Sequence, residues 1–185
     1  DVDCDADLPY VRVENAEFAY ARIAANLAGH PAERMRLIGV TGTKGKTTVT
    51  HLVRAILEKN GRSCGLIGTS EVLIGERVLE SHATTPEPPE LNAYFSEMAA
   101  EGCEFCVMEV SSHALALNRV AGCEYDVAVL TNITQDHLDF HQTFESYRQA
   151  KALLFKHLHE GAKPGKCAVF NSDDASSALI MKETK

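Results

Sequence analysis

The sequence predicts an α/β fold in which helices cover both faces of a mostly parallel β-sheet. Short apolar runs alternate along the chain with segments whose apolar residues recur at helical spacing. A glycine-rich turn over residues 39–48 joins one such run to an amphipathic helix. That context is typical of a P-loop-type nucleotide-binding domain.

The composition indicates a packed globular domain. Hydrophobic residues make up 45% of the 185 residues and charged residues 24%. The formal net charge of −8 argues against general binding to nucleic acid or to an anionic membrane. The sequence shows no signal peptide and no apolar run long enough to span a membrane, so we expect a cytoplasmic protein without membrane insertion.

The six cysteines are expected to be reduced, small apolar residues. Cys103 and Cys106 have the C-x-x-C spacing of a redox or metal pair. The apolar interpretation is favoured because Cys106 lies in a strand-like run and no second C-x-x-C completes a zinc site. The cysteines are Cys4, Cys64, Cys103, Cys106, Cys123 and Cys167.

The first elements follow in order along the chain. A helix is predicted over residues 15–28, with Asn15 as its N-cap and the stretch at 29–31, Gly-His-Pro, as its end. Residues 36–40 predict a buried strand. The helix that follows, over 46–60, carries a single apolar stripe and ends at a glycine. Its stripe consists of Val49, Leu52, Val53, Ile56 and Leu57.

The middle of the chain begins with a strand at 64–67 and a hairpin near 71–80 around Gly75. Residues 84–89 predict a loop, because their three prolines interrupt regular structure. A helix follows that loop and ends at Gly102. Further strands are expected at 105–110, 125–130 and 167–170, and further helices after a cap at Ser111 or Ser112, at 144–158 and at 174–182.

The turn at 39–48 has the features of a phosphate-binding loop. Its backbone N–H groups and the following helix N-terminus can bind phosphate oxygens. Lys46 can reach the terminal phosphates, and the Thr47 hydroxyl can bind Mg²⁺. The usual G-x-x-x-x-G-K-[ST] pattern has glycine where this chain has Val40. A plain glycine-rich turn with a surface lysine is the alternative, but the order of strand, turn, Gly-Lys-Thr and helix favours the phosphate loop.

Two further segments are expected at the same edge of the sheet, because ligands bind at the carboxyl ends of parallel strands. Glu109 ends one apolar run and is a natural Mg²⁺ ligand, although a surface glutamate is the alternative. The segment at 131–141 follows another run. Its His137 and His141 have the spacing of a zinc pair on one helix face, but no third ligand is evident. A single histidine that binds a second metal ion is favoured over zinc, and a polar connecting loop remains the other alternative.

Lys151 falls on the apolar stripe of its helix, at i+7 from Phe144 and i+4 from Tyr147. A lysine in this position either extends its ammonium group to solvent or is partly desolvated, which favours the neutral amine. A neutral amine can add CO₂ and become a carbamate able to bind a metal ion. The pattern alone favours the lysine whose ammonium group extends to solvent.

Several of these motifs together resemble one family. The chain is similar to the central, ATP-binding domain of Mur ligases, and within that family to the UDP-N-acetylmuramoyl-tripeptide synthetases (MurE type). The similarity extends from about residue 36 to residue 185. The matching motifs are 41–48 (TGTKGKTT), 84–86 (TTP), 108–113 (MEVSSH), 131–141 (TNITQDHLDFH) and 147–151 (YRQAK).

The resemblance implies a role for each matching position. The ATP phosphates are expected at Gly42, Thr43, Lys44, Gly45, Lys46, Thr47 and Thr48. One Mg²⁺ ion is expected at Thr47 and Glu109, and a second at His137 and a carbamylated Lys151. The UDP-muramoyl-dipeptide is expected at Thr84, Thr85, Ser111 and Arg119. The chain departs from the family pattern at Lys44, where many members have Asn, and at Leu117 and Ala83.

The resemblance also implies a reaction: ATP-dependent addition of a diamino acid, meso-diaminopimelate or L-lysine, to the D-Glu carboxylate of UDP-MurNAc-L-Ala-D-Glu through an acyl phosphate. This step belongs to peptidoglycan synthesis, and so to cell-wall biogenesis, cell shape and cell division. Residues 1–35 are expected to be the tail of the N-terminal UDP-binding domain and 36–185 an incomplete central domain. The C-terminal ligase domain is absent, so we expect this chain alone to be inactive. A folylpolyglutamate synthetase-like ligase, a non-catalytic nucleotide-binding module and a P-loop kinase are the alternatives.

Overall fold

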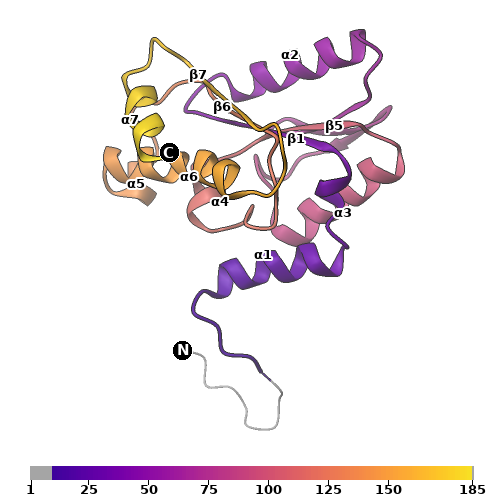
Figure 1. Cartoon of the computed structure of the whole chain (residues 1–185), viewed down its shortest axis with the longest axis horizontal. Helices are drawn as coiled ribbons and strands as arrows, with labels where there is room; N and C mark the ends of the chain where they lie inside the picture. Colours follow the sequence, from indigo (N-terminus) through magenta and orange to yellow (C-terminus); the bar gives the residue numbers. More distant parts are fainter. Residues whose placement is uncertain (1–9, 185) are drawn as a thin grey trace.

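The computed structural model describes residues 10–184, and its centre is a seven-stranded β-sheet (Figure 1). Five strands are parallel, and β3 and β4 form an antiparallel hairpin at one edge. The order across the sheet is β4-β3-β2-β5-β1-β6-β7. The strands are β1 (Arg36–Thr41), β2 (Cys64–Ile67), β3 (Glu71–Ile74), β4 (Arg77–Glu80), β5 (Phe105–Glu109), β6 (Val127–Leu130) and β7 (Cys167–Phe170).

Helices cover both faces of the sheet, which confirms the predicted fold class. In Figure 1, α2 lies on one face, and α3, α4 and α6 lie on the opposite face, with α1 packed beneath α3. The helices are α1 (Ala16–Leu27), α2 (Lys46–Lys59), α3 (Pro88–Ala100), α4 (Ser112–Ala116), α5 (Leu138–His141), α6 (Phe144–Glu160) and α7 (Ala175–Glu183), with a 3₁₀ turn, η1 (Pro31–Arg34). Neither α5 nor η1 is expected from the sequence, because a single turn has no apolar periodicity.

Helix ends follow the expected capping chemistry. The Asn15 side chain accepts a hydrogen bond from the Phe18 N–H at 2.9 Å, and Ser111 rather than Ser112 caps α4. The loop predicted over 84–89 is wrong at its end, since Pro88 and Pro89 form the first turn of α3. Prolines fit there because the first N–H groups of a helix have no partner within the helix.

The core consists of one apolar layer on each face of the sheet. The smaller layer lies under α2 and includes Ile38, Val40 and Val107. The single apolar stripe predicted for α2 is only partly correct. Val49, Val53 and Leu57 pack on this layer, whereas Leu52 and Ile56 are 57% and 61% exposed. The reason is that α2 lies over β2, β5 and β1, which contact only one side of the stripe.

The described part of the segment at 1–35 packs against the domain, because α1 contacts α3, and η1 leads into β1. The assignment of this segment to a different domain stays a prediction. Cys4 and the residues before it lie outside the described residues. The other five cysteines are free, as expected. Among residues 10–184, no helix combines the length and the apolar character needed to cross a membrane.

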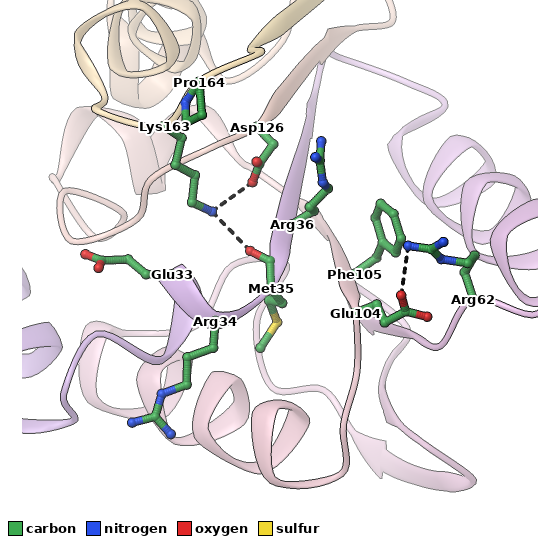
Figure 2. Close-up of a pocket in the computed structure, with 10 residues that line it drawn as sticks. All are labelled: Glu33, Arg34, Met35, Arg36, Arg62, Glu104, Phe105, Asp126, Lys163 and Pro164. Atoms are coloured by element: carbon green, nitrogen blue, oxygen red, sulfur yellow. Dashed lines mark hydrogen bonds and ion pairs between the residues drawn. The ribbon is translucent and has the colours of Figure 1, made fainter.

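A cavity of about 460 Å³ lies at the amino ends of β1 and β5, away from the predicted site (Figure 2). Two ion pairs line it: Lys163 with Asp126 at 2.8 Å, and Arg62 with Glu104 at 2.8 Å. In Figure 2 the side chain of Arg34 extends away from the ion pair between Lys163 and Asp126. Four of the charged side chains that line this cavity are therefore already paired with one another.

Candidate functional site

The glycine-rich turn leaves β1 and leads directly into α2, as expected for a phosphate loop. Gly42 has φ +148° and Gly45 has φ +85°, values that favour glycine. A Cβ atom on Gly42 would lie 1.9 Å from Thr131 Oγ1, so neighbouring backbone and side chains also require a glycine. Gly45 directly precedes Lys46, the first residue of α2. The loop therefore presents the positive end of the α2 dipole at the carboxyl edge of the sheet.

Lys46 lies across this loop. Its Nζ atom donates to the carbonyl oxygens of Gly42 at 2.9 Å and Thr43 at 3.1 Å. Burial lowers the pKa of Lys46, and the negative charges of Glu109 and Asp136 oppose this shift. The ammonium group is thus held over the turn by backbone carbonyl groups, beside the N-terminus of α2.

Glu109 ends β5 next to the loop, and it is buried, with 1% of its surface exposed. Its Oε1 atom accepts from the Thr47 hydroxyl at 2.9 Å and from the Thr69 N–H at 2.9 Å, and its Oε2 atom accepts from the Thr69 hydroxyl at 3.1 Å. The sequence prediction missed Thr69. Its position directly after β2 could have indicated it, because β2 pairs in parallel with β5 and the carboxyl ends of both strands lie at the same edge of the sheet.

Lys151 is 1% exposed, so it does not extend to solvent. Its Nζ atom donates to the Gly42 carbonyl oxygen at 2.9 Å and lies 4.6 Å from the centre of the Tyr147 ring. Burial, together with the nearby positive charge of Lys46, lowers the pKa of Lys151 to about 7. Two lysine amines therefore share one carbonyl acceptor, and one of them is substantially neutral near pH 7.

His137 lies beside Tyr147, with ring centres 6.2 Å apart, and its side chain is exposed. Its ring packs edge-on against His113 at 4.9 Å. His141 is buried, and burial is the main cause that lowers its pKa. Within residues 10–184, no group of three or more His, Cys, Asp or Glu side chains is arranged to hold a metal ion. The structure thus gives no support to the zinc alternative at His137 and His141.

The four residues expected on the substrate side surround the end of β5. The Thr85 hydroxyl donates to the Glu109 carbonyl oxygen at 2.9 Å and accepts from the Ser111 N–H at 3.0 Å. Arg119 donates to the Thr85 carbonyl oxygen at 3.4 Å and pairs with Glu87 at 2.7 Å. The Thr84 hydroxyl lies 3.0 Å from that of Thr69.

The segment after β6 fastens the phosphate loop through contacts that the sequence prediction did not assign. The Asn132 side chain makes two hydrogen bonds to the backbone of Lys44. Its Oδ1 atom accepts from the Lys44 N–H at 3.1 Å, and its Nδ2 atom donates to the Lys44 carbonyl oxygen at 2.9 Å. The Thr131 hydroxyl donates to the same carbonyl oxygen at 2.8 Å. The Thr43 hydroxyl lies 3.0 Å from the Tyr147 hydroxyl. Strand ends and α6 together fix the shape of the loop.

Comparison with known proteins gives a family match and similar sequences. A family model described as the Mur ligase middle domain matches residues 40–185. The UDP-N-acetylmuramoyl-L-alanyl-D-glutamate–2,6-diaminopimelate ligase of Bacillus velezensis is 48% identical over 98% of this chain. That of Geobacillus kaustophilus is 50% identical over 96% of this chain. The matched regions are only 38% and 37% of those relatives, so this chain spans little more than a third of their length.

Two solved structures place the fold. The structure of a UDP-N-acetylmuramoyl-L-alanyl-D-glutamate–2,6-diaminopimelate ligase matches with a TM-score of 0.77 and 32% identity, over 89% of this chain and 33% of that one. Mycobacterium tuberculosis folylpolyglutamate synthase, complexed with ADP and AMPPCP, matches with a TM-score of 0.64 and 18% identity, over 90% of this chain and 44% of that one. The second likeness is one of fold alone.

Proposed function

The chain belongs to the Mur ligase family, and from this premise we propose that it forms the ATP-binding part of a ligase that extends a peptidoglycan precursor. The ligase would add 2,6-diaminopimelate to the D-Glu carboxylate of UDP-MurNAc-L-Ala-D-Glu. The names and identities of the relatives support this substrate pair over the alternatives of folylpolyglutamate synthesis, a P-loop kinase and a non-catalytic module. These relatives are named as 2,6-diaminopimelate ligases, which favours diaminopimelate over L-lysine as the added amino acid. The chain spans little more than a third of the length of these relatives, so we propose the whole activity only for a ligase of their length.

The contacts of the phosphate loop with three charged or titratable groups carry the proposal. Lys46 and Lys151 both donate to the Gly42 carbonyl oxygen, and the Glu109 carboxylate accepts from the Thr47 hydroxyl. A loop of N–H groups with a lysine suits the β- and γ-phosphates of ATP. We assign this binding to residues 42–48.

The oxygen donors beside the loop fit Mg²⁺, which prefers carboxylate and hydroxyl ligands. Thr47 and Glu109 would hold one ion. His137 and Lys151 would hold the second if Lys151 carries a CO₂-derived carbamate, because an ammonium group cannot bind a metal ion. A pKa of about 7 supports that modification, since only the neutral amine adds CO₂. Bound Mg²⁺ would supply positive charge to the phosphoryl group during its transfer.

The proposed reaction has two steps. The D-Glu carboxylate attacks the γ-phosphorus atom of ATP, which gives an acyl phosphate and ADP. The amine of the incoming diamino acid then attacks the acyl carbon and releases phosphate. In this scheme Lys46 stabilises the negative charge of the phosphoryl oxygens, and Thr84, Thr85, Ser111 and Arg119 bind the UDP-linked substrate. Positioning and electrostatics, rather than a protein nucleophile, provide the catalysis.

Nucleotide binding by the 185-residue chain tests the ATP assignment. Calorimetry with Mg²⁺ and the ATP analogue AMPPNP should show binding that Lys46→Met weakens about 10- to 100-fold, through loss of a charged hydrogen bond. Lys59→Met is the matched control, since Lys59 is exposed at the far end of α2 and should leave the affinity unchanged. Equal affinities of the Lys46→Met variant and the wild type would contradict the assignment. Amide-bond formation by these 185 residues alone would contradict the inference that other domains are required.

A further inference from the structure

Thr69 lies between two parts of the site. It follows β2 at the carboxyl edge of the sheet, where its N–H group and its hydroxyl both contact the Glu109 carboxylate, at 2.9 and 3.1 Å. The same hydroxyl lies 3.0 Å from the Thr84 hydroxyl. One side chain therefore contacts both the proposed metal-binding carboxylate and a proposed substrate-binding residue.

The Thr69 hydroxyl has a single proton and two acceptors within hydrogen-bonding distance. A hydroxyl group has one proton to donate, whereas an ionised carboxylate can only accept. The Thr69 hydroxyl is placed to donate either to the Oε2 atom of Glu109 or to the Thr84 hydroxyl, so these two acceptors compete for its one proton. When the Thr84 oxygen is engaged by another donor, the Thr69 proton is left to Glu109.

We propose that Thr69 is a positioning residue that couples the substrate-side loop at Thr84 to the metal-binding carboxylate of Glu109. This inference rests on the proposed function. A substrate group that donates to the Thr84 hydroxyl oxygen occupies the competing acceptor, so Thr69 donates to Glu109 and holds the carboxylate in one orientation. Substrate binding and metal–nucleotide binding thereby favour one another through Thr69.

The burial of Glu109 makes the Thr69 hydroxyl important. Glu109 is 1% exposed, and within residues 10–184 its Oε2 atom accepts a hydrogen bond from the Thr69 hydroxyl and from no other group. The Oε1 atom keeps its bonds to Thr47 and to the Thr69 N–H whatever side chain stands at position 69. Loss of the hydroxyl therefore frees one carboxylate oxygen selectively. Groups that orient a metal ligand in this way typically change metal affinity about 10- to 100-fold.

The test is a double-mutant cycle on Thr69 and Thr84 in the 185-residue chain. The dissociation constant for Mn²⁺ is measured by electron paramagnetic resonance in the presence of AMPPNP. Thr69→Val, which keeps the side-chain shape and the N–H donor, should weaken Mn²⁺ binding about tenfold. Thr69→Ser, which keeps the hydroxyl, is the matched control and should restore affinity to within about twofold.

Thr84→Val removes the competing acceptor, so it should tighten Mn²⁺ binding in the wild type but change nothing in the Thr69→Val background. Wild-type affinity of the Thr69→Val variant, no effect of Thr84→Val, or two effects that simply multiply would each overturn the coupling. Thr69→Val removes a hydrogen bond to a buried carboxylate and should lower the unfolding temperature, so Mn²⁺ binding is measured below that temperature, where each variant is folded.

Glu109→Gln separates this inference from the proposed function. If Glu109 is not a metal ligand, Glu109→Gln leaves Mn²⁺ binding unchanged and the proposed metal site itself fails. If Glu109→Gln abolishes binding while Thr69→Val does not, the metal site stands and only the coupling is wrong.

Discussion

Replacing Lys151 by methionine should stabilise the fold near neutral pH, although it removes a residue of the proposed site. Lys151 has 1% of its surface exposed and lies among α6 and the phosphate loop. Its charged form loses the solvation that it has in the unfolded chain. Methionine has a similar length and no charge, so it should occupy the same space at little steric cost.

The magnitude follows from the pKa of Lys151, which burial lowers from 10.5 to about 7. Between these two pH values the unfolded chain binds one proton more than the folded chain. The free energy of unfolding of the wild type should therefore rise with pH by about 1.4 kcal/mol per pH unit above pH 7. Below pH 7 the whole penalty remains, at most about 5 kcal/mol.

The net gain from methionine is smaller, because the variant also loses the hydrogen bond from Lys151 to Gly42. After subtraction of about 1–2 kcal/mol for that bond, Lys151→Met should be more stable than the wild type by about 3 kcal/mol below pH 7. The difference should shrink as the pH rises from 7 towards 10.5 and the wild-type amine becomes neutral.

Urea unfolding of both proteins between pH 6 and pH 9 in CO₂-free buffer measures this difference. Lys59→Met is the control, because Lys59 is an exposed residue at the end of α2, on the other face of the sheet from α6. Stability curves of the wild type and Lys151→Met that run parallel would refute the argument, since they would mean that Lys151 is charged and solvated. With ¹³C-labelled bicarbonate at pH 8, a carbamate signal should appear in the wild type and be absent from Lys151→Met.

Two further predictions concern the loop. Gly42→Ala should cost about 3 kcal/mol or more and weaken AMPPNP binding, because its Cβ atom would lie 1.9 Å from Thr131 Oγ1; chemical unfolding and calorimetry measure this, and wild-type values would contradict it. Asn132→Leu should cost about 1–2 kcal/mol and speed amide exchange at 43–45, because both hydrogen bonds to the Lys44 peptide are lost. Asn132→Asp keeps the acceptor for the Lys44 N–H and should give an exchange rate between those of the wild type and Asn132→Leu. Equal exchange rates in the Asn132→Asp and Asn132→Leu variants would contradict the role of the side-chain hydrogen bonds in holding the loop.

The sheet could be predicted because each buried strand is a continuous apolar run followed by a turn. The parallel arrangement followed from the helices between these runs. The predictions that were wrong concern features that depend on contacts with other elements of the fold. Leu52 and Ile56 fit the apolar pattern of α2, but whether they are covered depends on which strands lie beneath the helix. Pro88 and Pro89 were assigned to a loop, although their φ angle is also that of a first helical turn.

The site was predictable where a residue type has an uncommon position. Glu109 at the end of an apolar run and Lys151 on an apolar stripe are such cases. The pattern alone favoured a solvent-exposed ammonium group at Lys151, which is wrong: the residue is buried, and its acceptor, Gly42, lies 109 residues away in the sequence. Thr69 was not predicted, and Asn132 was predicted at this edge of the sheet but without its partner, for a different reason. A single hydroxyl or amide after a strand has no characteristic spacing, and only the strand order shows which strand ends are neighbours.

Val40, which stands where the usual phosphate-loop pattern has glycine, is accounted for by the strand. Its side chain is buried in the apolar layer beneath α2, and its carbonyl oxygen accepts from the Val110 N–H at 2.8 Å. Position 40 is therefore still part of β1, where a branched apolar residue is favoured. The sharp change of direction occurs at Gly42, where φ is +148° and no side chain fits. The requirement for glycine has moved two residues towards α2, while Gly45, Lys46 and Thr47 keep their positions relative to the helix.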